Sequence, residues 1–216
     1  LLSVLDGSRN LTATLESLDR QLPSAQDRAL VRRLCNRVLR DLPALEWRLQ
    51  QLLKKPLKER DREVHFLLLL ALDQLLEGRE PAAAVIHASV AATRTLEKPH
   101  LAGLSNAVLR NFQRRRESLE SRLPGRPELR YGMPDWLIER VRADWPGDWR
   151  EILDQSNSSP PLWLRVNRRR CEKSMLAERL LQAGIDSHPV AGLPDALRLD
   201  QPARISALPG YAEGAF

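Results

Sequence analysis

Arginines are spaced along two segments with helical periodicity, and residues of this type in this arrangement suit anion binding. The guanidinium group is planar and presents paired N–H donors, so it suits phosphate oxygens and also stacks on bases. On these helical segments the RNA-binding candidates are Arg32, Arg33, Arg37, Arg110, Arg114, Arg115 and Arg116. Two other interpretations stay open, because exposed arginines also form solvated helix faces and a cationic helix end suits the backbone dipole.

A third candidate surface follows the segment 162–167. Apolar residues alternate there with Trp163, Arg165 and Asn167, which predicts a strand with one buried and one exposed face. An exposed aromatic ring, a guanidinium and an amide would stack on a base, hold phosphate and contact a base edge. The competing interpretation is a tryptophan buried against another domain. The RNA-binding candidates of this segment are Trp163, Arg165, Asn167, Arg168 and Arg169.

No pattern in the sequence indicates catalysis or metal binding. Glycine-rich phosphate loops, a nucleophile elbow and a zinc-binding histidine motif are absent. The two cysteines make neither a disulfide framework nor a zinc set. Cys35 lies in a helical pattern as a small core residue, and Cys171 follows three arginines without a histidine nearby in the sequence. We assign no catalytic, cofactor-binding or metal-binding residue.

Composition limits the class of protein and of partner. The 216 residues are 43% hydrophobic, enough for a packed core, and carry a net charge of +6. Nearly all of that excess comes from arginine, which favours RNA among anionic partners. No secretion signal is visible, and the longest apolar run, 66–72, is far too short to span a bilayer. We expect a cytoplasmic protein without a membrane partner.

The periodicity predicts a mainly α protein in three parts. Residues 1–122 form an all-helical domain whose central core helix contains the run 66–72, apolar on every side. The alanine-rich segment 81–96 predicts a helix that approaches its neighbours closely, and Leu101, Leu104, Val108 and Phe112 predict the buried stripe of the helix 101–116. Residues 123–159 form a linker with short helices.

Residues 160–216 form a small α+β unit. The strand 162–167 precedes a helix that begins at Ser174, and a second strand covers 196–199. A third strand is expected at 204–208. The first residues resemble the end of a helix, and the last residues carry no cap. We therefore expect a chain that has lost residues at its N-terminus and is truncated at its C-terminus.

Several stretches together resemble one family. They are LCNRVLR (34–40), GLSNAVLRNF (103–112), RYGMPDWL (130–137), PPLWLRVN (160–167), LPDALRL (193–199) and LPGYAEGAF (208–216). In this order they resemble the N-terminal part of the RsmB (Fmu/Sun) family of small-subunit ribosomal RNA (cytosine-5)-methyltransferases. The helical part is similar to NusB, an all-helical RNA-binding fold.

The resemblance implies a NusB-like domain, an RRM-like pre-methyltransferase region, and a third domain that binds S-adenosylmethionine and carries two catalytic cysteines. Neither Cys35 nor Cys171 lies in the family's catalytic cysteine contexts, so we expect an inert fragment without cofactor. Its expected partners are small-subunit ribosomal RNA and its own catalytic domain, and we expect a monomer. The alternatives are a non-catalytic NusB-like RNA-binding module in transcription antitermination or ribosome assembly, and a protein-docking unit.

Overall fold

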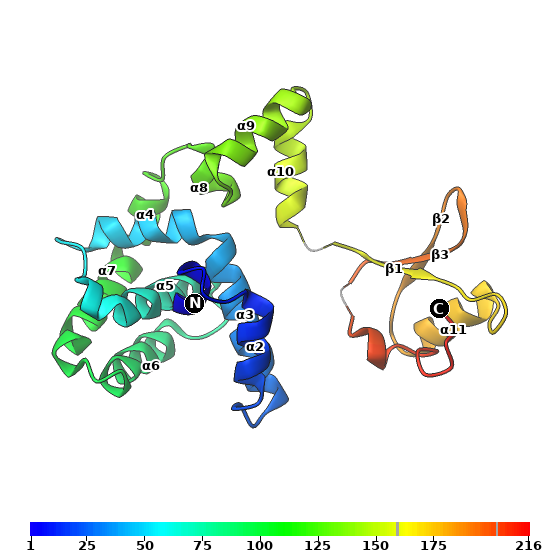
Figure 1. Ribbon diagram of the computed structural model, residues 1–216, viewed down its shortest axis with the longest axis horizontal. Helices are drawn as coiled ribbons and strands as arrows, with labels where there is room; N and C mark the ends of the chain where they lie inside the picture. The colour runs from blue at the N-terminus through cyan, green and yellow to red at the C-terminus, as the bar shows by residue number, and fades with distance from the viewer. Residues whose placement is uncertain (159, 202) are drawn as a thin grey trace. The chain divides into compact units, whose positions relative to one another are not determined.

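The computed structural model describes residues 1–158, 160–201 and 203–216 (Figure 1). Residue 159, the last of the predicted linker 123–159, lies outside the described residues. The chain divides into two compact units, Leu1–Gln155 and Ser156–Phe216, and each is considered by itself below.

The first unit is helical throughout its regular structure. Its helices are α1 (Leu2–Leu5), α2 (Leu11–Asp19), α3 (Ala25–Arg40), α4 (Leu42–Leu52), α5 (Arg62–Glu77), α6 (Ala82–Thr95), α7 (Ala102–Glu120), α8 (Pro127–Tyr131), α9 (Asp135–Asp144) and α10 (Trp149–Asn157), the last of which runs past the unit's boundary. The side chain of Ser24 accepts a hydrogen bond from the N–H of Asp27 and so caps the start of α3.

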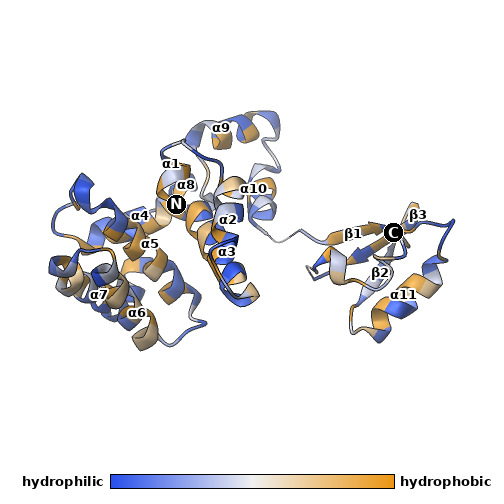
Figure 2. Ribbon diagram, turned by 60° about the horizontal axis from the view of Figure 1, so that its bottom comes forward, coloured by the Kyte–Doolittle hydropathy of each residue, from blue (hydrophilic) through white to orange (hydrophobic). Residues whose placement is uncertain are grey.

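Helix α5 is the central core helix, as predicted. It packs against α3, α4, α6 and α7, and Leu68, Leu69 and Leu72 have no exposed surface. Figure 2 shows that α5 is hydrophobic along most of its length. The helix ends at Gly78, whose φ of 68° is the left-handed conformation that terminates helices.

The contact between α6 and α7 corrects two predictions. Ala83, Ala84, Ala88 and Ala91 are exposed, so these four alanines do not mediate the close approach of α6, whereas Ala82 packs against the core. The buried face of α6 instead carries Val85, Ile86, Ser89 and Thr93, and the Thr93 hydroxyl lies 3.1 Å from that of Ser105 on α7. The buried face of α7 is therefore rotated toward Ser105 and Leu109, which leaves Leu104 36% exposed.

Residues after α7 form a second, smaller core. The predicted linker contains α8, and Tyr131 at its end packs with Ile138, Trp149 and Leu153. Gly132 follows with a φ of 64°, and its Cα comes so close to α3 that an added Cβ would lie 1.9 Å from the carbonyl oxygen of Arg40. The RYGMPDWL stretch is thereby fixed against the helical body.

The second unit is a three-stranded antiparallel sheet with one helix. Its elements are β1 (Leu162–Arg165), α11 (Lys173–Gln182), β2 (Ser187–Val190) and β3 (Leu193–Leu199), and the strand order is β1-β3-β2. The strands predicted within 162–167 and 196–199 are confirmed. The strand expected at 204–208 is wrong, because Ile205–Ala207 is a 3-10 turn. Strand β2 contains Pro189, which hides it in the sequence but which an edge strand tolerates.

Candidate nucleic-acid interface

The arginines of α3 are held by carboxylates of the same unit. Arg33 donates to both carboxylate oxygens of Glu77 at 2.7 Å, and Arg37 donates through Nε and Nη2 to the two oxygens of Asp73 at 3.0 Å. Arg32 forms an ion pair with Asp19 on α2. These three candidates therefore join α3 to α5 and α2, and their charge is largely compensated within the unit.

The arginines of α7 divide into two kinds. Arg116 donates to the carbonyl oxygens of Leu75 and Leu76 at 3.0 Å each, so it caps the C-terminal end of α5. Arg110 lies on the exposed side and donates only to Asn106 on the same helix, at 3.3 Å. In the described part of the chain, Arg114 and Arg115 have no carboxylate within ion-pair distance. On α7, Arg110, Arg114 and Arg115 are the cations available to an anionic partner.

A further arginine joins α4 to α7. Arg48 is 6% exposed and donates to both oxygens of Glu120, from Nε to Oε1 and from Nη2 to Oε2, at 2.8 Å each. These hydrogen bonds hold the pKa of Glu120 below its ordinary value of 4.5. A carboxylate with a depressed pKa stabilises the fold above its unfolded-state pKa, and this contribution is lost as the pH falls through the folded-state pKa.

Replacing Glu120 by glutamine is expected to flatten the acid side of the stability curve. Wild type should be the more stable protein at pH 6, and its advantage should shrink as the pH falls from 5 to 3. Urea unfolding of both proteins across that range measures this difference. Carboxyl groups remote from Arg48 and Glu120 are common to both proteins, so their contributions cancel. If the difference in stability between the two proteins did not change with pH, the depressed pKa of Glu120 would be contradicted.

The alternation predicted for 162–167 is present. Leu164 and Val166 are 4% exposed and belong to the core of the second unit, whereas Trp163 is 49% exposed and Arg165 is also exposed. An open hollow of about 750 Å³ follows this strand. It is lined by all five RNA-binding candidates of the segment together with Leu162, Leu164, Val166, Asp195, Ile205 and Phe216.

Two of those five candidates also have partners within the unit. The Asn167 amide donates from Nδ2 to the carbonyl of Gly214 at 3.0 Å and accepts the N–H of Arg169 at 3.2 Å, so it orders the turn after β1. Arg168 forms an ion pair with Asp195. Trp163, Arg165 and Arg169 remain the groups that face solvent without a carboxylate partner among the described residues.

Sequence analysis missed Arg198 and His188. In the antiparallel register, Arg198 on β3 lies directly opposite Trp163 on β1 and opposite His188 on β2. In the sequence of β3, Arg198 stands between Leu197 and Leu199, which are buried. This alternation could have predicted that Arg198 lies on the exposed face of the strand. The position of His188 was hidden because β2 was not predicted.

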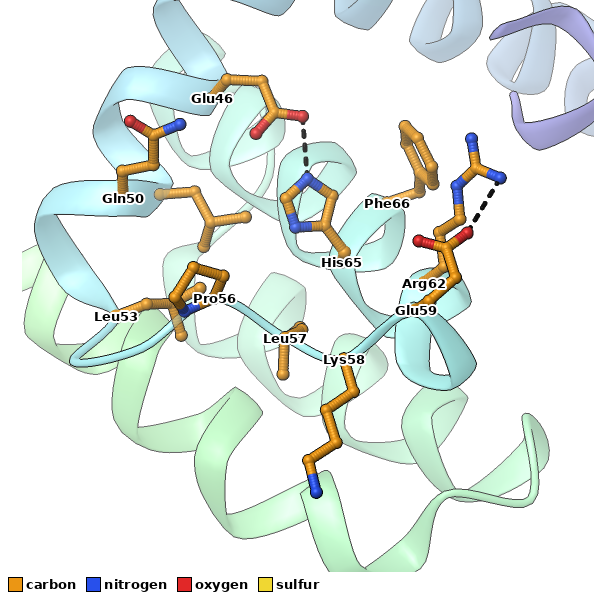
Figure 3. A pocket seen from close by; sticks show the side chains of 11 residues that line it. Glu46, Gln50, Leu53, Pro56, Leu57, Lys58, Glu59, Arg62, His65 and Phe66 are labelled. Atoms are coloured by element: carbon orange, nitrogen blue, oxygen red, sulfur yellow. Dashed lines mark hydrogen bonds and ion pairs between the residues drawn. The ribbon is translucent and has the colours of Figure 1, made fainter. Parts of the chain in front are cut away.

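A separate pocket of about 400 Å³ lies in the helical unit between α4, α5 and the segment that joins them (Figure 3). His65 and Glu46 form a hydrogen bond of 2.8 Å at its wall. This carboxylate–imidazole pair could accept a proton, but no serine, threonine, cysteine or tyrosine lines the pocket, and Lys58 extends away from the pair. The described residues also contain no metal-binding cluster and no helix able to span a membrane.

Comparison with family models decides the family of the helical unit. The NusB family model matches residues 4–114, just over half of the chain. The chain belongs to the NusB family. A second model, the ferredoxin-like domain of RsmF/B-like methyltransferases, matches residues 133–206. The mainly α fold with a small α+β region is thus confirmed, as is the resemblance drawn from the sequence.

Curated relatives of this NusB-family chain match both units. Ribosomal RNA small subunit methyltransferase B of Serratia proteamaculans is 43% identical over 98% of the chain and 49% of the relative. The protein of the same name from Klebsiella pneumoniae is 40% identical over 98% of the chain and 48% of the relative. The chain therefore spans about half the length of these curated relatives.

One solved structure has a similar fold. The crystal structure of PH0851 matches with a TM-score of 0.61 and 14% identity, over 98% of this chain and 49% of that one. At this identity the match supports the fold alone.

Proposed function

We propose that this chain is the RNA-recruiting part of an S-adenosylmethionine-dependent methyltransferase that modifies a cytosine C5 in small-subunit ribosomal RNA. The observation that supports this most is the 43% identity to Ribosomal RNA small subunit methyltransferase B along both units. Several cations have no carboxylate partner among the described residues, among them Arg114 and Arg115 on α7 and Arg165 and Arg169 by β1, and these support an RNA partner.

The residues of this chain do not fit S-adenosylmethionine. Such cofactors bind at the carboxyl ends of parallel strands, beside a glycine-rich turn, whereas the described sheet is antiparallel and its hollows are lined by arginines or exposed loops. We therefore assign the methyl transfer to a catalytic domain outside this chain and propose that the chain alone is inert. That domain is its proposed protein partner, and we propose a monomer in the cytoplasm.

A second candidate function is a non-catalytic NusB-like RNA-binding module in transcription antitermination or ribosome assembly. The match of the NusB model to residues 4–114 favours it for the helical unit. This second function does not account for the match of the ferredoxin-like model to residues 133–206, whereas the methyltransferase function accounts for it.

Replacing Arg114 and Arg115 by glutamine is expected to weaken RNA binding without unfolding the helical unit. Each arginine that neutralises a phosphate contributes about 0.7 to 0.9 to the slope of log K against log salt concentration. The double variant should therefore show a slope shallower by about 1.5. Fluorescence anisotropy with labelled fragments of small-subunit ribosomal RNA, at several salt concentrations, measures it.

The matched control is Arg140→Gln on α9, because Arg140 pairs with Asp144 on an exposed helix face. It should leave the slope unchanged. Arg116 stays untouched in this experiment, since its substitution would remove the cap of α5. A double variant with the wild-type slope would exclude these α7 arginines from the RNA surface.

A further inference from the structure

The sheet of the second unit has one covered and one open face. Helix α11 lies against the covered face, where Leu176 and Leu180 pack with residues of β1 and β3 (Figure 1). The register places Trp163, Arg198 and His188 in one row across the opposite face. All three side chains are exposed. The open face therefore combines a large aromatic ring with cationic and imidazole groups from all three strands.

One carboxylate holds two members of the row, Arg198 and His188. Asp200 accepts hydrogen bonds from Nε of Arg198 at 3.1 Å and lies 3.0 Å from Nε2 of His188. The imidazole and the guanidinium thus have a defined neighbour before any partner binds. Because less side-chain freedom is lost on binding, such an arrangement favours stacking.

An apolar hollow of about 350 Å³ adjoins Trp163. It is bounded by Leu193 and Pro194 at the start of β3, and Leu193 is 51% exposed. Arg165 and Asp195 line the same hollow, and Arg169 lines the larger hollow that also borders Trp163. Arg165 and Arg169 have no carboxylate partner in the described part of the chain. A flat apolar group with an anionic backbone would match the indole and these two cations at once.

We propose that the open sheet face binds an unpaired segment of RNA. One base stacks on Trp163 beside Arg198, and the adjoining phosphates lie on Arg165 and Arg169. Base faces in a duplex are stacked on each other and closed to side chains, whereas unpaired bases expose them. The charge of the face favours RNA over a protein partner, since four arginines and two aspartates surround the indole. This inference rests on the proposed RNA-binding function and names the form of RNA that the second unit takes.

The test compares two variants of similar apolar size in the complete chain, Trp163→Phe and Trp163→Leu. Only phenylalanine retains an aromatic face. The probes are a fluorescein-labelled single-stranded RNA of ten nucleotides and the blunt-ended duplex of that strand with its complement. Trp163→Leu is expected to weaken binding to the single strand about 10-fold and to the duplex less than 2-fold. Trp163→Phe should retain most of the single-strand affinity. Thermal unfolding confirms that each variant is folded.

The possible outcomes separate this inference from the proposed function. Equal single-strand affinity in wild type and Trp163→Leu would overturn the inference, while salt-dependent binding through Arg114 and Arg115 would preserve the proposed function. Equal losses in both variants would also overturn it, because they indicate a shape-specific contact, as with a protein partner. If wild type bound neither RNA, both would fail.

Discussion

Replacing Gly132 by alanine is expected to lower the free energy of unfolding of the helical unit by about 3 kcal/mol. Two costs combine at this position. A side chain at φ 64° is strained, and its Cβ would lie 1.9 Å from the carbonyl oxygen of Arg40, where backbone meets backbone. Neither group can move without shifting α3 or the segment after α8. Urea unfolding followed by circular dichroism measures the loss.

Gly78→Ala is the matched control, because Gly78 has nearly the same backbone conformation, with φ 68°, but no atom within 4 Å of an added Cβ. It should cost only the conformational strain, about 1 kcal/mol. Equal losses in the two variants would show that the contact between Gly132 and Arg40 contributes nothing.

Replacing Arg37 by methionine is expected to destabilise the helical unit by about 2 kcal/mol or more. The variant leaves the carboxylate of Asp73 without its two hydrogen bonds, and the side chain of Asp73 is only 1% exposed. The loss is smaller than for a fully buried pair because Arg37 itself is 37% exposed. Unfolding by urea at pH 7 gives the value.

A double variant separates this cause from a general effect of the substitution. Adding Asp73→Leu to Arg37→Met removes the unpaired carboxylate and should restore much of the stability. Arg32→Met is the control, since its pair with Asp19 is more open to solvent and should matter little. RNA affinity measured at a temperature where Arg37→Met remains folded should equal that of wild type. A specific loss of RNA affinity there would return Arg37 to the binding surface.

Helical periodicity predicted most of the fold, and the exceptions have physical reasons. The run 66–72 identified the core helix because a helix that is apolar all round has to be surrounded. The buried face of α7 was misplaced because Ser105, a polar residue, is buried beside Thr93 on α6, and sequence spacing does not show which neighbour a helix meets. Strand β2 was missed because Pro189 at a sheet edge resembles a loop in the sequence.

The candidate site was predictable only where its residues are neighbours in the sequence. The alternation at 162–167 placed Trp163 and Arg165 on one face, and both are exposed. The sequence did not show that Arg37 and Arg33 on α3 are paired, because their carboxylate partners lie 36 and 44 residues away. The row formed by Trp163, Arg198 and His188 likewise required the register of the sheet.

The paired arginines of α3 affect how the helical unit meets a polyanion in solution. An ion pair is close to neutral beyond a Debye length of about 8 Å at physiological ionic strength. A diffusing RNA would therefore respond less to the α3 arginines than to cations without a carboxylate partner among the described residues, such as Arg110 and Arg114 on α7. Such unpaired charges steer a polyanion before contact. The pairs that stabilise the fold thus also make the encounter rate depend on where the unpaired charges lie rather than on the net charge of +6.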